Sequence, residues 1–198
     1  MDNNEWIEIK TLNFVNVYVR LTLAVSFILV LIVGLVLMDS LRMEETFFII
    51  YIIYVALEIA IHEQFHRLGG KWFLGINSEI DLKWSFYNFL FGIKRENGVS
   101  TPTHPFCKPK RWLNLKEKIV FALSPFIFYT VLWTLLMVIT GFQVKTFIFA
   151  LTVSWAFCHG DFWAVFFSIY NKHKYRADYK DIQFADMGDH LVLWGKTQ

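Results

Sequence analysis

The chain contains long stretches of apolar residues that are too continuous for the interior of a small soluble domain. Hydrophobic residues make up 56% of its 198 residues. A bilayer core is crossed by about 20 consecutive, mostly apolar helical residues. Stretches of this kind cover about 17–38, 46–68, 118–140 and 145–171. They predict a mainly α, polytopic membrane protein with about four transmembrane helices, forming a single domain over 1–198 with a tail over 172–198.

The distribution of lysine and arginine orients these predicted helices. All of the 19 such residues except Arg42 and Lys145 fall in the amino-terminal segment, in the segment 67–118 or in the tail. Because loops rich in Lys and Arg stay in the cytoplasm, both termini are expected on the cytoplasmic side of a lipid bilayer. The small net charge of +2 gives no indication of nucleic-acid binding.

Two segments of the sequence are expected to form short β structure. From 76 to 86, apolar residues occupy every even position except Ser78, and polar residues occupy the odd positions. This pattern predicts a short amphipathic β element within the segment 67–118. In the tail, the apolar segments 182–184 and 190–194 flank a turn-forming sequence, which predicts a small C-terminal hairpin.

The second apolar stretch ends in an H-E-x-x-H motif that runs from His62 to His66. Helical positions i and i+4 share one face, so both imidazoles can hold one metal ion while Glu63 acts as a base for a water molecule there. Ionisable residues inside a bilayer cost about 2.5–3.5 kcal/mol each on insertion scales, so the cluster indicates a functional site. The alternative is a polar helix end that lies just outside the membrane.

Matching depth in the membrane selects a third ligand. A catalytic zinc ion takes three protein ligands and keeps one position for water. Asp161 lies as far into its predicted helix as His62 lies into its own, so the two side chains are expected at the same level. His159 lies about 200° from Asp161 around the helix, and we expect it to bond a neighbouring backbone or hydroxyl group. Cys158 shares the face of Asp161 and is the alternative third ligand.

Other residues are expected to support this site. Glu58 lies one turn before His62 and could accept its free imidazole N–H, or form an interhelical hydrogen bond instead. Pro125 should kink the third apolar helix and free a backbone carbonyl, and Ser124 could replace the lost bond.

With His62 to His66 and Gly160-Asp161, the chain resembles the zincin peptidases among small bacterial membrane proteins, relatives of the site-2 intramembrane proteases. The likeness extends to the long basic loop, to Ser124-Pro125 and to Gly188-Asp189. It implies a zinc-dependent endopeptidase of a bacterial cell membrane that acts on a membrane protein or peptide. Asp161 lacks the Leu-Asp-Gly context and the upstream Asn-Pro of site-2 proteases, so a close site-2 mechanism or substrate is not implied.

Three functions fit these residues. The first is a membrane-embedded zinc endopeptidase near the cytoplasmic side, with the strand around 80–86 holding an unwound substrate by strand addition. The second is a non-catalytic zinc-binding membrane protein, such as an accessory or immunity factor, and the third is a different hydrolytic reaction at the same zinc site. Glu63 discriminates between them, because a structural site needs no base and is expected to close its fourth position with a ligand such as Cys158.

Overall fold

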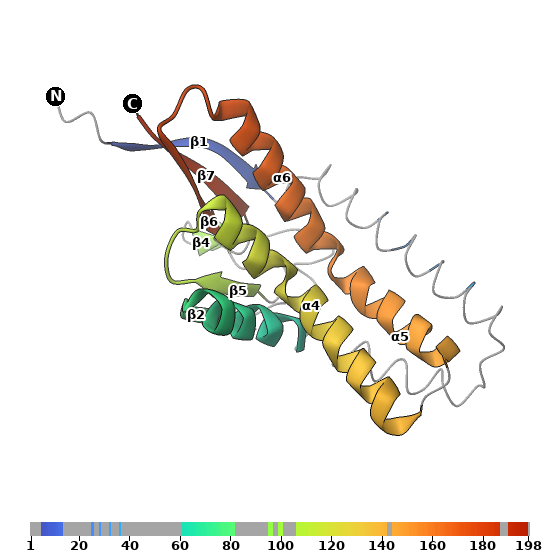
Figure 1. The fold of residues 1–198 in the computed structure, drawn as a ribbon. Helices are drawn as coiled ribbons and strands as arrows, with labels where there is room; N and C mark the ends of the chain where they lie inside the picture. Colours follow the sequence, from blue (N-terminus) through green and yellow to red (C-terminus); the bar gives the residue numbers. More distant parts are fainter. Residues whose placement is uncertain are drawn as a thin grey trace.

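The structure joins apolar helices to small antiparallel sheets (Figure 1). This computed structural model describes residues 5–13, 61–81, 95–96, 99–100, 106–141, 144–186 and 190–197, together with helical positions at 25, 28, 32 and 36. Within these residues the predicted fold class, mainly helical with added β elements, is confirmed.

The largest sheet is formed by the two ends of the chain. Strands β6 (Asp181–Asp186) and β7 (His190–Lys196) pair antiparallel, which confirms the C-terminal hairpin. Strand β1 (Trp6–Asn13) pairs antiparallel with the other edge of β7, and a register shift lies between Glu8 and Lys10. Strand β1 was not predicted from the sequence. Its pairing places both termini side by side (Figure 1).

Two smaller sheets lie in the basic segment. Strand β2 (Ser78–Asp81) pairs antiparallel with β5 (Phe106–Pro109), and β3 (Arg95–Glu96) pairs with β4 (Val99–Ser100). The predicted amphipathic strand is confirmed over β2, and its positions 82–86 lie outside the described residues.

Among the continuously described segments of the chain, the longest helix is α4 (Leu115–Thr140). Asn114 and Glu117 close its first turn as a capping box, because each side chain bonds the other's backbone N–H. Gly141 ends it in the left-handed conformation, at φ 66°. Pro125 lies inside it, as the sequence predicts.

The fourth apolar stretch is not one continuous helix, which corrects the sequence prediction. Helix α5 (Val144–Phe157) and helix α6 (His159–Tyr175) meet at Cys158 with a bend of 50°. The Cys158 N–H bonds the carbonyl of Trp155, three residues back, at 3.1 Å, so the regular i to i−4 bonding is interrupted there.

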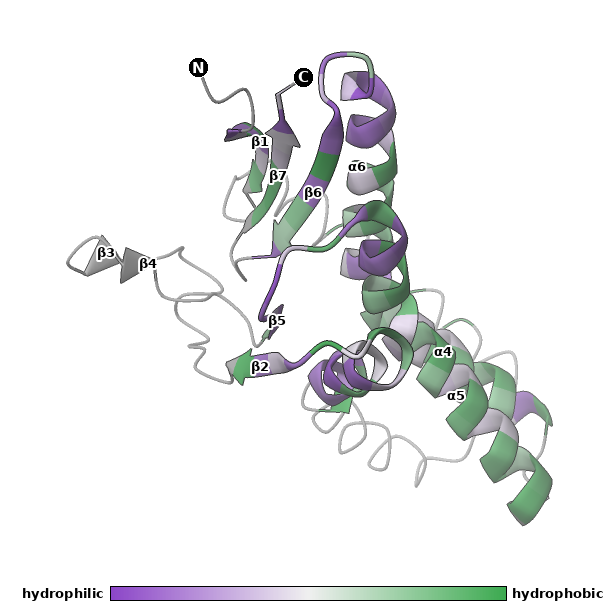
Figure 2. Cartoon of the chain, turned by 60° about the vertical axis from the view of Figure 1, so that its left-hand side comes forward, coloured by the Kyte–Doolittle hydropathy of each residue, from purple (hydrophilic) through white to green (hydrophobic). Residues whose placement is uncertain are grey.

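Among the described residues, one helix is long and apolar enough to cross a membrane, or two if the bent pair counts as one span. The helix is α4, and the bent pair is α5 with α6. Figure 2 shows apolar residues concentrated along α4 and α5 and polar residues around the three-stranded sheet. Most of the first two predicted spans lies outside the described residues, although Val25, Ile28, Ile32 and Val36 are helical and exposed.

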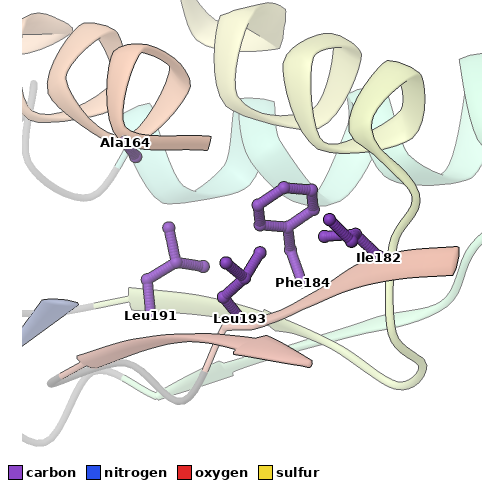
Figure 3. Packing of buried hydrophobic residues seen from close by; sticks show 5 residues of the cluster. All are labelled: Ala164, Ile182, Phe184, Leu191 and Leu193. Atoms are coloured by element: carbon purple, nitrogen blue, oxygen red, sulfur yellow. The ribbon is translucent and has the colours of Figure 1, made fainter. Parts of the chain in front are cut away.

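The three-stranded sheet packs against the helices through one face. Its hairpin contributes alternate side chains, Ile182 and Phe184 from β6 and Leu191 and Leu193 from β7, which point toward the helices (Figure 3). Ala164 of α6 completes this cluster, and all five residues are buried. A reciprocal backbone pairing between Leu113 and Phe184 then joins the hairpin to the residues just before α4. The sheet therefore fixes the near ends of α4 and α6 relative to each other.

Candidate metal centre

The H-E-x-x-H motif lies on a helix of residues 61–74 that is in close contact with α4. Gly69 permits this contact, because a Cβ atom there would lie 2.1 Å from the Cβ of Ser124. Gly70 packs in the same way on Phe121. Two adjacent glycines, one turn after His66, therefore bring the motif against α4 (Figure 1).

Three predicted ligands converge between this helix and α6. His62 Nε2 lies 3.1 Å from Asp161 Oδ2, and His66 Nε2 lies 3.1 Å from Asp161 Oδ1. One ligand atom from each residue falls within 4.8 Å of the others, a spacing that could hold a metal ion. Asp161 is therefore brought to the two histidines, as the depth argument predicts.

The hydrogen bond at His66 Nδ1 defines which ring nitrogen is free to bind a metal. Nδ1 lies 2.9 Å from the backbone carbonyl oxygen of Phe121, which can only accept, so Nδ1 carries the hydrogen. In the neutral ring Nε2 then has a lone pair, and it faces a carboxylate oxygen of Asp161. Two acceptors at this distance repel each other unless a cation or a proton lies between them. The arrangement therefore fits a metal ion.

His62 is held mainly by aromatic contacts. Its ring stacks on Tyr129 at 6.3 Å and meets His66 edge to face at 4.9 Å. Its Nδ1 is buried, and none of the described residues gives it a hydrogen-bond partner. Glu58, the predicted partner, lies outside the described residues.

Asp161 lies in the first turn of α6, and the bend at Cys158 creates that helix start. The amino-terminal end of a helix carries a partial positive charge, which stabilises a carboxylate there. One carboxylate oxygen, Oδ2, is buried and has no hydrogen-bond donor among the described residues, although His62 Nε2 approaches it. An unsatisfied buried oxygen of this kind is a suitable ligand for a cation.

Glu63 is outside the ligand group and faces a strand edge. Its carboxyl group lies near the backbone N–H of Cys107 in β5 and near Asp161, and both groups affect it electrostatically. The Cys107 side chain is buried, and burial together with the nearby negative charge of Glu63 raises the pKa of its thiol to about 12. Glu63 thus lies beside the metal ligands without being one of them.

The two neighbours of Asp161 that were weighed as alternatives have other partners. His159 Nδ1 lies 2.9 Å from the Ala156 carbonyl oxygen, which confirms the expected backbone bond. Cys158 is buried and its thiol donates to the Ser154 carbonyl oxygen at 3.5 Å. It is not part of the group of three residues that could hold a metal ion.

A buried ion pair next to the ligands was not predicted. Lys118 Nζ lies 2.7 Å from Asp186 Oδ2, and it also lies 5.9 Å from the ring centre of Phe121, which stacks on His66. The lysine marks the start of an apolar stretch and the aspartate lies in the tail, so no local pattern relates them. The free Phe121 carbonyl, in contrast, can be predicted from the sequence. Pro125 lies four residues later and has no N–H with which to bond this carbonyl.

Comparison with protein-family models, curated proteins and solved structures finds no match to this chain. Its function is therefore inferred from the site itself. The site brings together three residues that could hold a metal ion, with the Glu63 carboxyl group and strand β5 nearby.

Proposed function

We propose that the chain is a zinc-dependent, membrane-embedded endopeptidase that acts near the cytoplasmic side of the bilayer. The observation that carries this proposal is the convergence of His62, His66 and Asp161 with Glu63 beside them. Two imidazoles and a carboxylate are a ligand set that zinc accepts at catalytic sites. The resemblance to zincin peptidases of small bacterial membrane proteins supports the same assignment.

The described ligand group supports a catalytic site over a structural one. A structural zinc site is closed by four protein ligands, whereas a catalytic site uses three and leaves a position for water or substrate. Three residues form the group within the described part of the chain, and Cys158 bonds elsewhere. A zinc ion held there would supply a Lewis acid that polarises water and a peptide carbonyl.

Glu63 is the proposed base. It would take a proton from the attacking water and pass it to the amine that leaves when the peptide bond breaks. Its position one residue after His62 gives the carboxyl group access to the same space without making it a ligand. In the free protein it lies near the Cys107 N–H, on the side of β5.

The outer edge of β5 offers a place for the substrate backbone. The Lys110 N–H bonds the Asn77 carbonyl oxygen at 3.0 Å, and antiparallel pairing alternates along a strand, so Cys107 turns its N–H and C=O away from β2. Strand addition at this edge would place an extended peptide next to Glu63. A transmembrane helix hides its amides, so the substrate would have to unwind before it could bind there.

The test is a comparison of membrane proteomes from cells that produce wild type, Glu63→Gln or His66→Ala. Glu63→Gln keeps the shape and removes the base, a contribution of about 10²–10⁴ in rate. We expect both variants to accumulate the same uncleaved membrane protein, while Gln64→Ala, at an exposed position of the same helix, behaves as wild type. If Glu63→Gln matches wild type and His66→Ala does not, metal binding matters without hydrolysis and the peptidase assignment is wrong.

A further inference from the structure

The proline inside α4 lies four residues after Phe121. In a regular helix the N–H of residue 125 would bond the carbonyl of residue 121. Pro125 has no N–H, so that carbonyl is released from the helix. It is also in the part of α4 that contacts the motif helix, because Phe121 packs on Gly70 and Ser124 lies against Gly69.

The released carbonyl oxygen has two other hydrogen-bond partners. His66 Nδ1 lies 2.9 Å from it, and the Ser124 hydroxyl donates to it at 2.7 Å. Both bonds are buried. A carbonyl oxygen has two lone pairs, so these two donors use its full capacity. Ser124 thus takes the role expected of it, and the other lone pair is occupied by a candidate metal ligand from a different helix.

We propose that Pro125 is a positioning residue for the metal centre. By removing one helix hydrogen bond, it leaves the Phe121 carbonyl to hold the hydrogen of His66 on Nδ1, so that Nε2 presents its lone pair toward Asp161. The ring of His66 is further fixed by stacking on Phe121, with ring centres 5.2 Å apart. This inference rests on the metal site of the proposed function, but not on catalysis.

The variant Pro125→Ala separates this role from a purely structural one. Alanine restores the N–H and favours the helix, so the metal-free protein is expected to unfold at a higher temperature. The restored N–H can donate its hydrogen bond to the Phe121 carbonyl, as in a regular helix. It therefore competes with His66 Nδ1 for that carbonyl oxygen. Loss of such an outer hydrogen bond typically lowers metal affinity about 10- to 100-fold. Higher stability with weaker zinc binding is a combination that simple damage to the fold does not produce.

The experiment measures zinc affinity by competition with a chelator, and thermal unfolding of the zinc-free protein, for wild type and Pro125→Ala. Two variants in α4 serve as controls. Ser124→Ala removes the other bond to the same carbonyl, and Thr134→Val removes a hydroxyl that bonds the Thr130 carbonyl far from the ligands. Both are expected to bind zinc within a few-fold of wild type.

Nitrogen NMR of His66 in zinc-free protein gives a second readout that does not depend on the metal. We expect the hydrogen to stay on Nδ1 in wild type and in Ser124→Ala, and to lose that preference in Pro125→Ala. Unchanged zinc affinity and an unchanged His66 tautomer in Pro125→Ala would overturn the inference, as would a lowered unfolding temperature. Absence of zinc binding in wild type would instead contradict the proposed function, and the NMR result would still decide the role of Pro125.

Discussion

Lys118 and Asp186 form an ion pair that joins the first turns of α4 to the end of β6, with Nζ 2.7 Å from Oδ2. The lysine side chain is only 3% exposed, so its ammonium group is removed from water where it meets this carboxylate. The pair couples the three-stranded sheet to the helix that holds the Phe121 carbonyl against His66. It is therefore a structural connection between the tail of the chain and the candidate metal centre.

Loss of one member of this pair should destabilise the fold strongly. Lys118→Met leaves the Asp186 carboxylate without its buried partner, and breaking a buried pair in this way typically costs about 3–5 kcal/mol. The double variant Lys118→Met/Asp186→Leu removes both charges and should recover most of the loss. Denaturant unfolding in detergent micelles measures the free energy of unfolding of both variants. A double variant no more stable than Lys118→Met would show that the pair does not act as a unit.

The close contact between Gly69 and Ser124 should be sensitive to a single methyl group. Gly69→Ala would place its Cβ 2.1 Å from the Ser124 Cβ, so the motif helix must move away from α4. Such overpacking typically costs about 1–3 kcal/mol. Ser124→Gly opens space for the new methyl group, so the two changes together should cost less than the sum of each alone. Strict additivity in a double-mutant cycle would contradict the contact.

The Cys107 thiol should be inert in the folded protein. Because burial raises its pKa to about 12, only about 1 in 10⁴ of the thiols is ionised at pH 8, and the thiolate is the reactive form. Alkylation with iodoacetamide at pH 8 in the Cys158→Ser variant reports Cys107 alone. We expect modification only after denaturation, and rapid labelling of the folded protein would refute the burial of β5 against the site.

Both ends of the chain should report the same side of the membrane. β1 pairs with β7, and the Thr197 N–H approaches the Glu5 carbonyl oxygen at 3.4 Å, so the termini are held together. The distribution of Lys and Arg predicts that this side is the cytoplasmic one. Reporter fusions at each terminus and labelling of a cysteine placed at Asn97 should all give cytoplasmic signals. Opposite signals from the two termini would contradict the β1–β7 pairing.

Patterns in the sequence predicted that His62, His66 and Asp161 would lie together. The i and i+4 spacing of His62 and His66 needs only a helix, and the helix is present. Asp161 was predicted as the third ligand because residues at equal distance along two spans of the same direction are expected at the same depth in the membrane. A backbone carbonyl left without its helix hydrogen bond was predicted because proline has no N–H. The spacing of the two histidines and the effect of Pro125 depend on backbone geometry that a short segment determines by itself, whereas the prediction of Asp161 compares two separate segments.

What was missed depends on contacts between distant segments. β1 pairs with a strand more than 170 residues away, and no local signal specifies that partner. The bend at Cys158 arises from one shifted hydrogen bond, which apolar periodicity does not register. The Lys118–Asp186 pair could not be predicted from the sequence, because only the fold brings these two distant residues together.

The most direct test of the metal centre is the zinc content of the purified protein, measured by mass spectrometry for wild type, Asp161→Ala and His159→Ala. Asp161 approaches both histidines, whereas His159 bonds the Ala156 carbonyl oxygen, and the two residues lie in the same turn of α6. We predict about one zinc per chain in wild type and in His159→Ala, and a large loss in Asp161→Ala. Zinc-free wild type, or equal zinc in the two variants, would contradict the assignment of Asp161 as a ligand.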